Sequence, residues 1–201
     1  MIAIIDYEMG NLRSVHKACE RVGLDAVVTS DESVVRSANA VILPGVGAFE
    51  QCMTNLAATG LIDAVLARIE AGKPFLGICL GLQLLFTRSY EDGEHAGLDV
   101  IGGDVLRLPD RVKVPHMGWN QVTYEEGCPL FDGVEQETNF YFVHSYYTKP
   151  RDASISAATV DYGLTFDCAV WRDNLFAVQF HPEKSGVHGL KMLENFGRLV
   201  A

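Results

Sequence analysis

The sequence is poor in basic residues and lacks a long hydrophobic segment. Its 201 residues include 16 lysines and arginines against 26 aspartates and glutamates, which gives a formal net charge of −10 at pH 7. Such a charge argues against a surface that follows nucleic-acid phosphates. No apolar run approaches the roughly 20 residues that a membrane-spanning helix needs, and no basic stretch precedes the first apolar segment. We therefore expect a soluble protein without a targeting segment.

Cysteine is also sparse, and its distribution excludes two classes of protein. The five cysteines are scattered, with no Cys-x-x-Cys pair and no His/Cys cluster at zinc-binding spacing. Neither a disulfide scaffold nor a metal site is indicated, and a reducing cytoplasm fits this pattern. A P-loop is absent as well, and nothing suggests a cofactor. With 48% hydrophobic residues the chain can bury one sizeable core, so residues 1–201 predict a single domain.

Hydrophobic periodicity predicts an α/β fold. Strands separated by helices imply a central, mostly parallel or mixed sheet flanked by helices. In the first half we expect strands at 2–5, 26–28 and 40–43, helices at 11–22 and at 49–71 with a break near Gly60, and a strand that ends at Cys79. In the second half we expect strands at 112–114, 121–124, 140–147, 154–159, 165–171 and 175–180, a hairpin turn at 172–174 and a helix at 187–199.

Cys79 is the most informative residue. It follows the apolar run from Phe75 to Ile78, lies between Gly77 and Gly81, and precedes a segment with helical periodicity. This pattern predicts a strained turn from strand to helix that exposes the sulfur, as in a nucleophile elbow. The positive end of the helix would lower the pKa of the thiol. A buried, inert cysteine is the alternative, and it is the interpretation we give to the other four cysteines.

A base and a carboxylate follow about a hundred residues later. His181 comes directly after the apolar run 175–180, and Pro182 biases its backbone towards an extended conformation. Residues two apart in an extended segment share a face, so Glu183 could hold the imidazole of His181 in one tautomer. A histidine of the core or surface is the alternative. Cys79, His181 and Glu183 together predict a nucleophile, a base and an orienting acid.

Pro44-Gly45-Val46-Gly47 closes a predicted strand and contains a Gly-x-Gly pair. The third glycine of a dinucleotide-binding motif is missing, and Glu50 would place a negative charge near a pyrophosphate, so nucleotide binding is disfavoured. Glycines also let backbone N–H groups approach a developing oxyanion closely. A tight turn that merely requires glycine is the other interpretation. If the Val46–Gly47 peptide rotates, this segment could switch the site on and off.

The Gly-x-Cys-x-Gly elbow and the His-x-Glu pair resemble those of the class I glutamine amidotransferases, over the whole chain. Within that family, three more segments resemble the glutaminase subunits of imidazole glycerol phosphate synthases. These are Ile5–Val15, Leu43–Phe49 and Pro115–Asn120. One departure is visible, because Glu8 stands where a small residue, often glycine, is expected.

The resemblance implies a flavodoxin-like fold, no cofactor, and hydrolysis of glutamine through a glutamyl thioester. It implies an oxyanion strand at Gly45, Val46 and Gly47, with the N–H of Leu80 as a further donor. Gly47, Gln83, Ser145 and Tyr146 would hold the amino acid end of glutamine. For Gln83 a capping or solvated role is the alternative, and for Ser145 and Tyr146 ordinary strand packing.

The resemblance also implies a partner. A (βα)₈-barrel cyclase subunit would receive the ammonia in a heterodimer and form imidazole glycerol phosphate and an aminoimidazole carboxamide ribotide in histidine biosynthesis. Large or charged side chains are the expected interface contacts. They are Asn11, Arg13, Met117, Trp119, Tyr141 and Lys184.

Three other functions stay open. The chain could supply ammonia for anthranilate, aminodeoxychorismate, purine or pyridoxal phosphate synthesis. It could be a cysteine hydrolase or γ-glutamyl peptidase that acts alone. It could also be an inactive binding module that keeps only the fold, although the intact triad argues against this.

Overall fold

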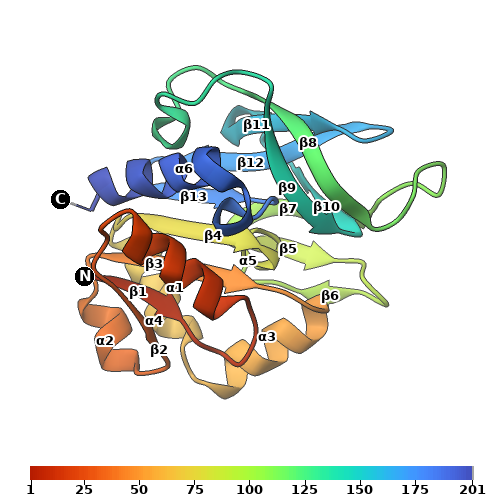
Figure 1. Ribbon diagram of the computed structural model, residues 1–201. Helices are drawn as coiled ribbons and strands as arrows, with labels where there is room; N and C mark the ends of the chain where they lie inside the picture. The colour runs from red at the N-terminus through yellow and green to blue at the C-terminus, as the bar shows by residue number, and fades with distance from the viewer. Residues whose placement is uncertain (201) are drawn as a thin grey trace.

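A mixed sheet with helices on both faces organises the chain (Figure 1). The computed structural model describes residues 1–200. The first half contributes β1 (Ile2–Ile5), α1 (Leu12–Arg21), β2 (Ala26–Thr29), α2 (Glu32–Ser37), β3 (Ala40–Gly45), α3 (Phe49–Ala58), α4 (Ile62–Glu70), β4 (Phe75–Cys79) and α5 (Leu80–Leu84). Strands β2, β1, β3 and β4 are parallel neighbours in that order, and β13 (Leu175–Val178) pairs in parallel with β4. The predicted α/β fold is therefore confirmed.

The second half extends the sheet and adds an antiparallel ribbon. Its remaining elements are β5 (Phe86–Ser89), β6 (His95–Ala96), β7 (Ile101–Arg107), β8 (His116–Tyr124), β9 (Thr138–His144), β10 (Tyr146–Pro150), β11 (Ser156–Asp161), β12 (Thr165–Arg172) and α6 (Gly186–Arg198). Short 3₁₀ turns lie at Pro129–Phe131, Ala153–Ile155 and Pro182–Lys184. The sheet continues from β13 through β12, β10, β7 and β5 to β6, while β11 leads from β12 to the β8–β9 ribbon.

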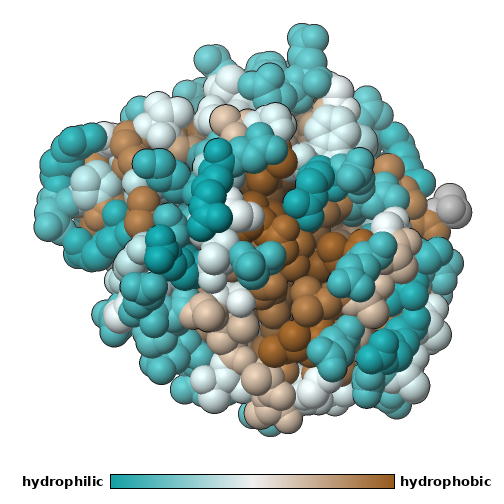
Figure 2. Space-filling model, turned by 180° about the vertical axis from the view of Figure 1, so that it is seen from behind, coloured by the Kyte–Doolittle hydropathy of each residue, from teal (hydrophilic) through white to brown (hydrophobic). Residues whose placement is uncertain are grey.

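Alternation along β1 explains the layered arrangement. Ile2 and Ile4 pack in the cluster that includes α1 and α6, whereas Ala3 and Ile5 pack in the cluster that includes α2, α3 and α4. Because successive strand residues point to opposite faces, a strand that is apolar throughout needs cover on both sides. Figure 1 shows α1 and α6 together on one face of the sheet. Seen from behind, a band of hydrophobic residues crosses the molecule between hydrophilic borders (Figure 2).

Several predicted elements have different bounds. The predicted strand 112–114 is wrong, because Val112 closes a turn onto Pro109 and no strand pairs with this segment. The predicted strand 140–147 is two strands, which separate at Ser145 where the chain leaves β8 for β7 and β12. The predicted strand 154–159 begins with a 3₁₀ turn, in which Asp152 accepts a hydrogen bond from the N–H of Ser154.

Some elements were not predicted. Helix α2 begins at an Asp31 cap that accepts the N–H of Ser33 at 2.8 Å, and strands β5, β6 and β7 were missed. Gly60 does separate two helices, and the hairpin turn at 172–174 does join β12 to β13. Glu8 has a φ of 65°, a left-handed conformation that glycine adopts without strain. This backbone conformation is the physical reason for a small residue at that position.

Among residues 1–200 no single helix is long and apolar enough to cross a membrane. Only α3 and α4 taken together, with a bend of 94° between them, reach that length and composition.

Candidate active site

Cys79 occupies a sharp turn between β4 and α5. Its φ of 57° is unusual for a residue with a side chain, and strain of this kind is frequent at functional sites. A β-carbon on Gly81 would overlap the carbonyl oxygen of Leu43, and one on Gly77 would lie 2.9 Å from the carbonyl oxygen of Gly81. The two glycines thus allow the turn to pack against β3. The elbow predicted from the sequence is present.

The accessibility of the thiol differs from the prediction. Cys79 is only 6% exposed, so its sulfur does not reach the outer surface. It lines a cavity of about 300 Å³ instead. The following helix, α5, is five residues long and is buried against the sheet, which is why the elbow lies below the surface.

His181 lies beside Cys79 in the same cavity, and Glu183 supports it from behind. The Nδ1 atom of His181 is 2.8 Å from Oε1 of Glu183, and both side chains are buried. The Nε2 atom of His181 is buried and has no other hydrogen-bond partner within residues 1–200, and the ring lines the cavity together with Cys79. Strand β13 ends at Val178, and the His181–Glu183 contact is made by a 3₁₀ turn. The predicted proximity is present, and His181 itself is extended as predicted, but the extended segment predicted to continue to Glu183 is a 3₁₀ turn instead.

At His181, stabilisation of the charged imidazole by its neighbours outweighs the cost of burying that charge. Burial alone would lower the pKa of the imidazole, but Cys79 and Glu183 raise that pKa to about 10. The surroundings therefore favour the protonated ring, and the carboxylate of Glu183 stabilises that charge. Asn11 adds to this arrangement, since its side-chain amide donates to Oε1 of Glu183 at 3.4 Å.

The cavity collects most of the predicted site residues. It is lined by Val46, Gly47, Cys79, Leu80, Gln83, Glu91, Pro115, Val143, His144, Ser145, Tyr146 and His181. A volume of about 300 Å³ lies at the small end of the range for small-molecule sites.

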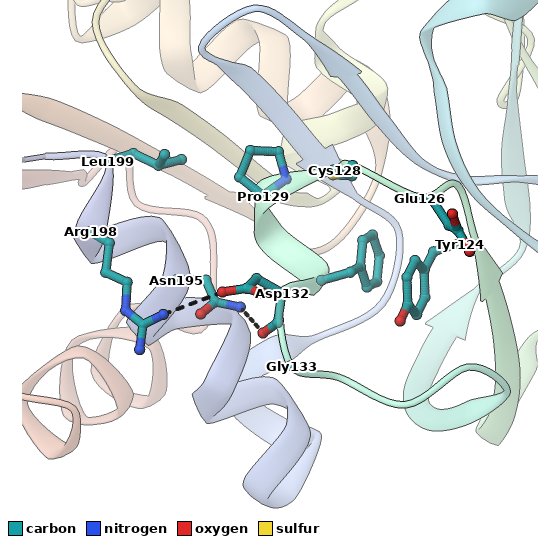
Figure 3. A pocket seen from close by; sticks show the side chains of 11 residues that line it. Tyr124, Glu126, Cys128, Pro129, Asp132, Gly133, Asn195, Arg198 and Leu199 are labelled. Carbon is teal, nitrogen blue, oxygen red and sulfur yellow. Dashed lines mark hydrogen bonds and ion pairs between the residues drawn. The ribbon is translucent and has the colours of Figure 1, made fainter.

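A larger cavity of about 510 Å³ lies elsewhere, between α6 and the segment after β8 (Figure 3). Its lining includes an ion pair of Arg198 with Asp132 and the amide of Asn195, which donates to the main-chain oxygen of Asp132. Neither Cys79 nor His181 lines it. The smaller cavity is therefore the better candidate, since it contains Cys79 and His181, the predicted nucleophile and base.

The predicted oxyanion segment borders the nucleophile. Gly45 is the parallel neighbour of Cys79 across β3 and β4, and a β-carbon on Gly45 would lie 2.8 Å from that of Leu80. Val46, Gly47 and Leu80 line the cavity, whereas Gly45 does not. The carbonyl oxygen of Val46 faces α3, where it accepts a hydrogen bond from the thiol of Cys52 at 3.5 Å. Rotation of the Val46–Gly47 peptide stays a prediction.

The residues predicted to hold the substrate form the opposite wall. Gln83 is buried, which excludes a solvated role, and its amide nitrogen donates to the carbonyl oxygen of Tyr146 and to Gln179, both at 3.0 Å. Ser145 and Tyr146 line the cavity at the junction of β9 and β10. Binding of a substrate by these groups stays a prediction.

Sequence reasoning missed Glu91. Its carboxylate lines the cavity, accepts the N–H of Phe49 at 2.7 Å, and has a pKa raised by burial. No motif marks this residue, which follows the end of β5 and contacts the start of α3 far away in the sequence. Glu91 is thus an acidic side chain of the cavity that no sequence motif indicated.

The six predicted interface residues differ in position. Met117 and Trp119 are 62% and 57% exposed, although both are large and apolar. Trp119 packs edge-on against the ring of Tyr141, and the ammonium group of Lys184 lies 5.9 Å from the same ring. Arg13 is exposed on α1, whereas Asn11 is engaged with Glu183. No cluster of three or more metal-ligating side chains is present among residues 1–200.

Comparison with known proteins identifies the family. Residues 3–199 match the family described as glutamine amidotransferase class-I. The chain belongs to the class I glutamine amidotransferases. It is 56% identical to the imidazole glycerol phosphate synthase subunit HisH of Syntrophotalea carbinolica, covering 98% of this chain and 99% of the relative. It is 54% identical to the HisH subunit of Geobacter sulfurreducens, covering 98% of both chains.

Solved structures agree on the amidotransferase fold. PurLQS from Thermotoga maritima superimposes with a TM-score of 0.72 at 17% identity, over 99% of this chain and 96% of that one. The glutaminase domain of CTPS from Trypanosoma brucei, solved with acivicin, gives a TM-score of 0.68 at 14% identity, over 99% and 92%. At such low identity the likeness concerns the fold of this amidotransferase alone.

Proposed function

We propose that this chain is the glutaminase subunit of an imidazole glycerol phosphate synthase and hydrolyses L-glutamine to glutamate and ammonia. The observation that carries the proposal is the single cavity shared by Cys79 and His181, with Glu183 hydrogen-bonded to the imidazole. Relatives that are 54% to 56% identical over nearly the whole chain bear that subunit's name.

The first half of the reaction releases ammonia. The thiolate of Cys79 attacks the side-chain carbonyl carbon of glutamine, and the carbonyl oxygen becomes an oxyanion. Backbone N–H groups of the Gly45–Gly47 segment and of Leu80 stabilise this charge, a contribution that usually amounts to a hundredfold or more for each donor. His181 then gives its proton to the departing nitrogen. Ammonia leaves, and a glutamyl thioester remains on Cys79.

The second half restores the enzyme. His181, now neutral, takes a proton from a water molecule that attacks the thioester. Glutamate leaves, and the proton returns the imidazole to its charged form beside the thiolate. Glu183 holds the ring in position through both halves, because its bond to Nδ1 keeps Nε2 directed at the cavity.

The amino acid end of glutamine binds away from the sulfur. The carboxylate of Glu91 pairs with the α-ammonium group, and Gln83, Ser145, Tyr146 and Gly47 line the space around it. A glutamine analogue that lacks the charged ammonium group should bind more weakly, since the half-buried carboxylate of Glu91 would lose its ionic partner.

The ammonia passes to a (βα)₈-barrel cyclase subunit that docks over the cavity. The exposure of Met117 and Trp119 is evidence for docking at this surface, because large exposed apolar side chains are typical anchors of interfaces. Lys184 follows Glu183 directly and packs on Tyr141. A contact between the partner and Lys184 would therefore affect the neighbouring triad residue. Arg13 and Asn11 lie at the α1 side of the same site.

The test compares two nitrogen sources. The chain is mixed with an imidazole glycerol phosphate synthase cyclase subunit, and product formation is followed with glutamine and with ammonium salt. Cys79→Ala should abolish the glutamine-driven reaction and leave the ammonia-driven reaction intact. Full glutaminase activity of the isolated chain, or glutamine-driven synthesis by Cys79→Ala, would contradict the proposal.

A further inference from the structure

Two buried histidines outside the triad contact each other. His116 and His144 are cross-strand neighbours at the end of the β8–β9 ribbon, and Nδ1 of His116 is 3.0 Å from Nε2 of His144. His144 lines the active-site cavity, whereas His116 stacks between the rings of Phe142 and Tyr162 at centroid distances of 4.8 and 3.9 Å. The stacking constrains the plane of the His116 ring, and the contacts of its nitrogens with His144 and Asn120 fix its orientation in that plane.

The inner end of this pair determines one tautomer. Nδ1 of His144 is 2.9 Å from the carbonyl oxygen of Tyr146, which can only accept a hydrogen bond. His144 therefore carries its proton on Nδ1. Burial lowers the pKa of His144 to about 3, so the ring is neutral and its Nε2 is an acceptor. It follows that Nδ1 of His116 donates to Nε2 of His144.

The outer end determines the second tautomer independently. The amide nitrogen of Asn120 donates to the carbonyl oxygen of Asp161 at 2.9 Å, and the amide oxygen accepts the N–H of Gln121 at 2.8 Å. These contacts fix the orientation of the amide. The same nitrogen is 3.3 Å from Nε2 of His116, which must accept. An additional proton on either ring would place two donors face to face. The series of hydrogen bonds from Asn120 through the two histidines to Tyr146 therefore has only one possible assignment of donors and acceptors.

The carbonyl oxygen of Tyr146 connects this chain to the nucleophile. It also accepts the amide of Gln83 at 3.0 Å, and Gln83 in turn donates to Gln179 at 3.0 Å. The amide of Gln179 lies 3.8 Å from the sulfur of Cys79. Gln83 and Gln179 are both buried. A displacement of the Tyr146 carbonyl would therefore change the positions of the side chains at the substrate wall and their contact with the sulfur.

We propose that His116 and His144 are positioning residues, which hold the Tyr146 carbonyl and the Gln83 amide at the wall of the cavity as neutral Nδ1–H tautomers. The kinetic part of this inference rests on the proposed function, since it places the amino acid end of glutamine at that wall. The arrangement also joins the cavity to β8, where Met117 and Trp119 point outward on the opposite face from His116 and Asn120.

The first experiment does not depend on the function. Nitrogen-15 NMR of the histidine-labelled chain at neutral pH should show protonated Nδ1 and unprotonated Nε2 for both residues, with a scalar coupling from Nδ1 of His116 to Nε2 of His144. His144→Asn and His116→Asn assign the signals. Protonation of Nε2 on either ring, or the absence of the coupling, overturns the proposal. Its failure would leave the glutaminase assignment intact.

The second experiment separates the two hydrogen bonds of His144. Asn places an amide donor where Nδ1 was, so His144→Asn keeps the bond to Tyr146 and loses the acceptor for His116. Gln places its amide where Nε2 was, so His144→Gln keeps the acceptor and loses the bond to Tyr146. In the complex with the cyclase subunit, His144→Gln should raise KM for glutamine about tenfold, and His144→Asn less than threefold.

In both variants kcat should change less than KM, because Tyr146 touches the substrate wall and not the reacting carbonyl. His188→Asn, on α6 outside this chain of hydrogen bonds, is the matched control and should leave both constants unchanged. Equal effects of the two His144 variants, or an unchanged KM for His144→Gln, overturn the proposal. If His144→Gln fails to fold, the NMR result decides. If all of these variants keep glutamine turnover and Cys79→Ala also keeps full activity, the proposed function itself is rejected instead.

Discussion

The α-carbon of Gly81 lies against the main-chain carbonyl oxygen of Leu43, so that a β-carbon at Gly81 would overlap this oxygen. The contact joins the first turn after Cys79 to β3, the strand that leads into the predicted oxyanion segment. The turn after Cys79 is therefore packed directly against β3, just before the predicted oxyanion segment.

Gly81→Ala should destabilise the chain by about 3 kcal/mol, since the added methyl group must push two backbone segments apart. Urea unfolding measures this. Gly102→Ala is the matched control, because a β-carbon there would meet only the Arg151 side chain, at 3.7 Å, an ordinary contact distance. Similar stabilities of the two variants would show that the junction relaxes without cost.

Glu183→Gln should lower kcat for glutamine by about a hundredfold or more while KM changes little. The carboxylate raises the pKa of His181 and stabilises its charged form, and a neutral amide cannot replace that charge. Steady-state kinetics with the cyclase subunit measures the effect. Glu194→Gln, which removes an exposed carboxylate on α6, should leave activity unchanged. A kcat for Glu183→Gln close to that of the unmodified chain would exclude Glu183 from the triad.

Glu91→Gln should raise KM for glutamine about tenfold and affect kcat less. Gln keeps an oxygen that can accept the N–H of Phe49, so the start of α3 stays capped, but the counter-charge for the ammonium group is lost. The size of the effect follows from the cost of leaving a charged group without its partner. Glu125→Gln, outside the cavity, is the control. An unchanged KM would place the ammonium group elsewhere.

Stability should fall as the pH drops below about 6.5. Burial lowers the pKa of His116 to about 4 and that of His144 to about 3, whereas the unfolded chain has the ordinary histidine value of about 6.5. Between these values the unfolded state binds more protons, so acid favours unfolding by up to about 1.4 kcal/mol per pH unit for each residue.

Urea unfolding from pH 7 to pH 5 measures this slope, and carboxylates contribute to it only towards the lower end. A chain with both His116→Asn and His144→Asn should have a shallower slope than the unmodified chain. Parallel slopes would mean that these two histidines are not buried in the neutral form.

Local signals were sufficient for the elements that form the parallel sheet. The apolar runs at β1, β3 and β4 and the glycines beside Cys79 each encode a strand or a turn within a few residues. The strands between 86 and 107 were missed and the segment 112–114 was interpreted incorrectly, because their conformation depends on which strand lies beside them. Val112 and Val114 alternate like strand residues, yet no partner strand is available to pair with them.

The sequence by itself determined the proposed chemistry of the site, since the identities and spacing of Cys79, His181 and Glu183 predict a nucleophile, a base and an acid. Tertiary structure decided which other groups meet them. Glu91 lines the cavity beside the start of α3, and His116 meets His144 through the register of β8 and β9. Such contacts join residues far apart in the chain, and they depend on strand pairing and packing that no short motif records.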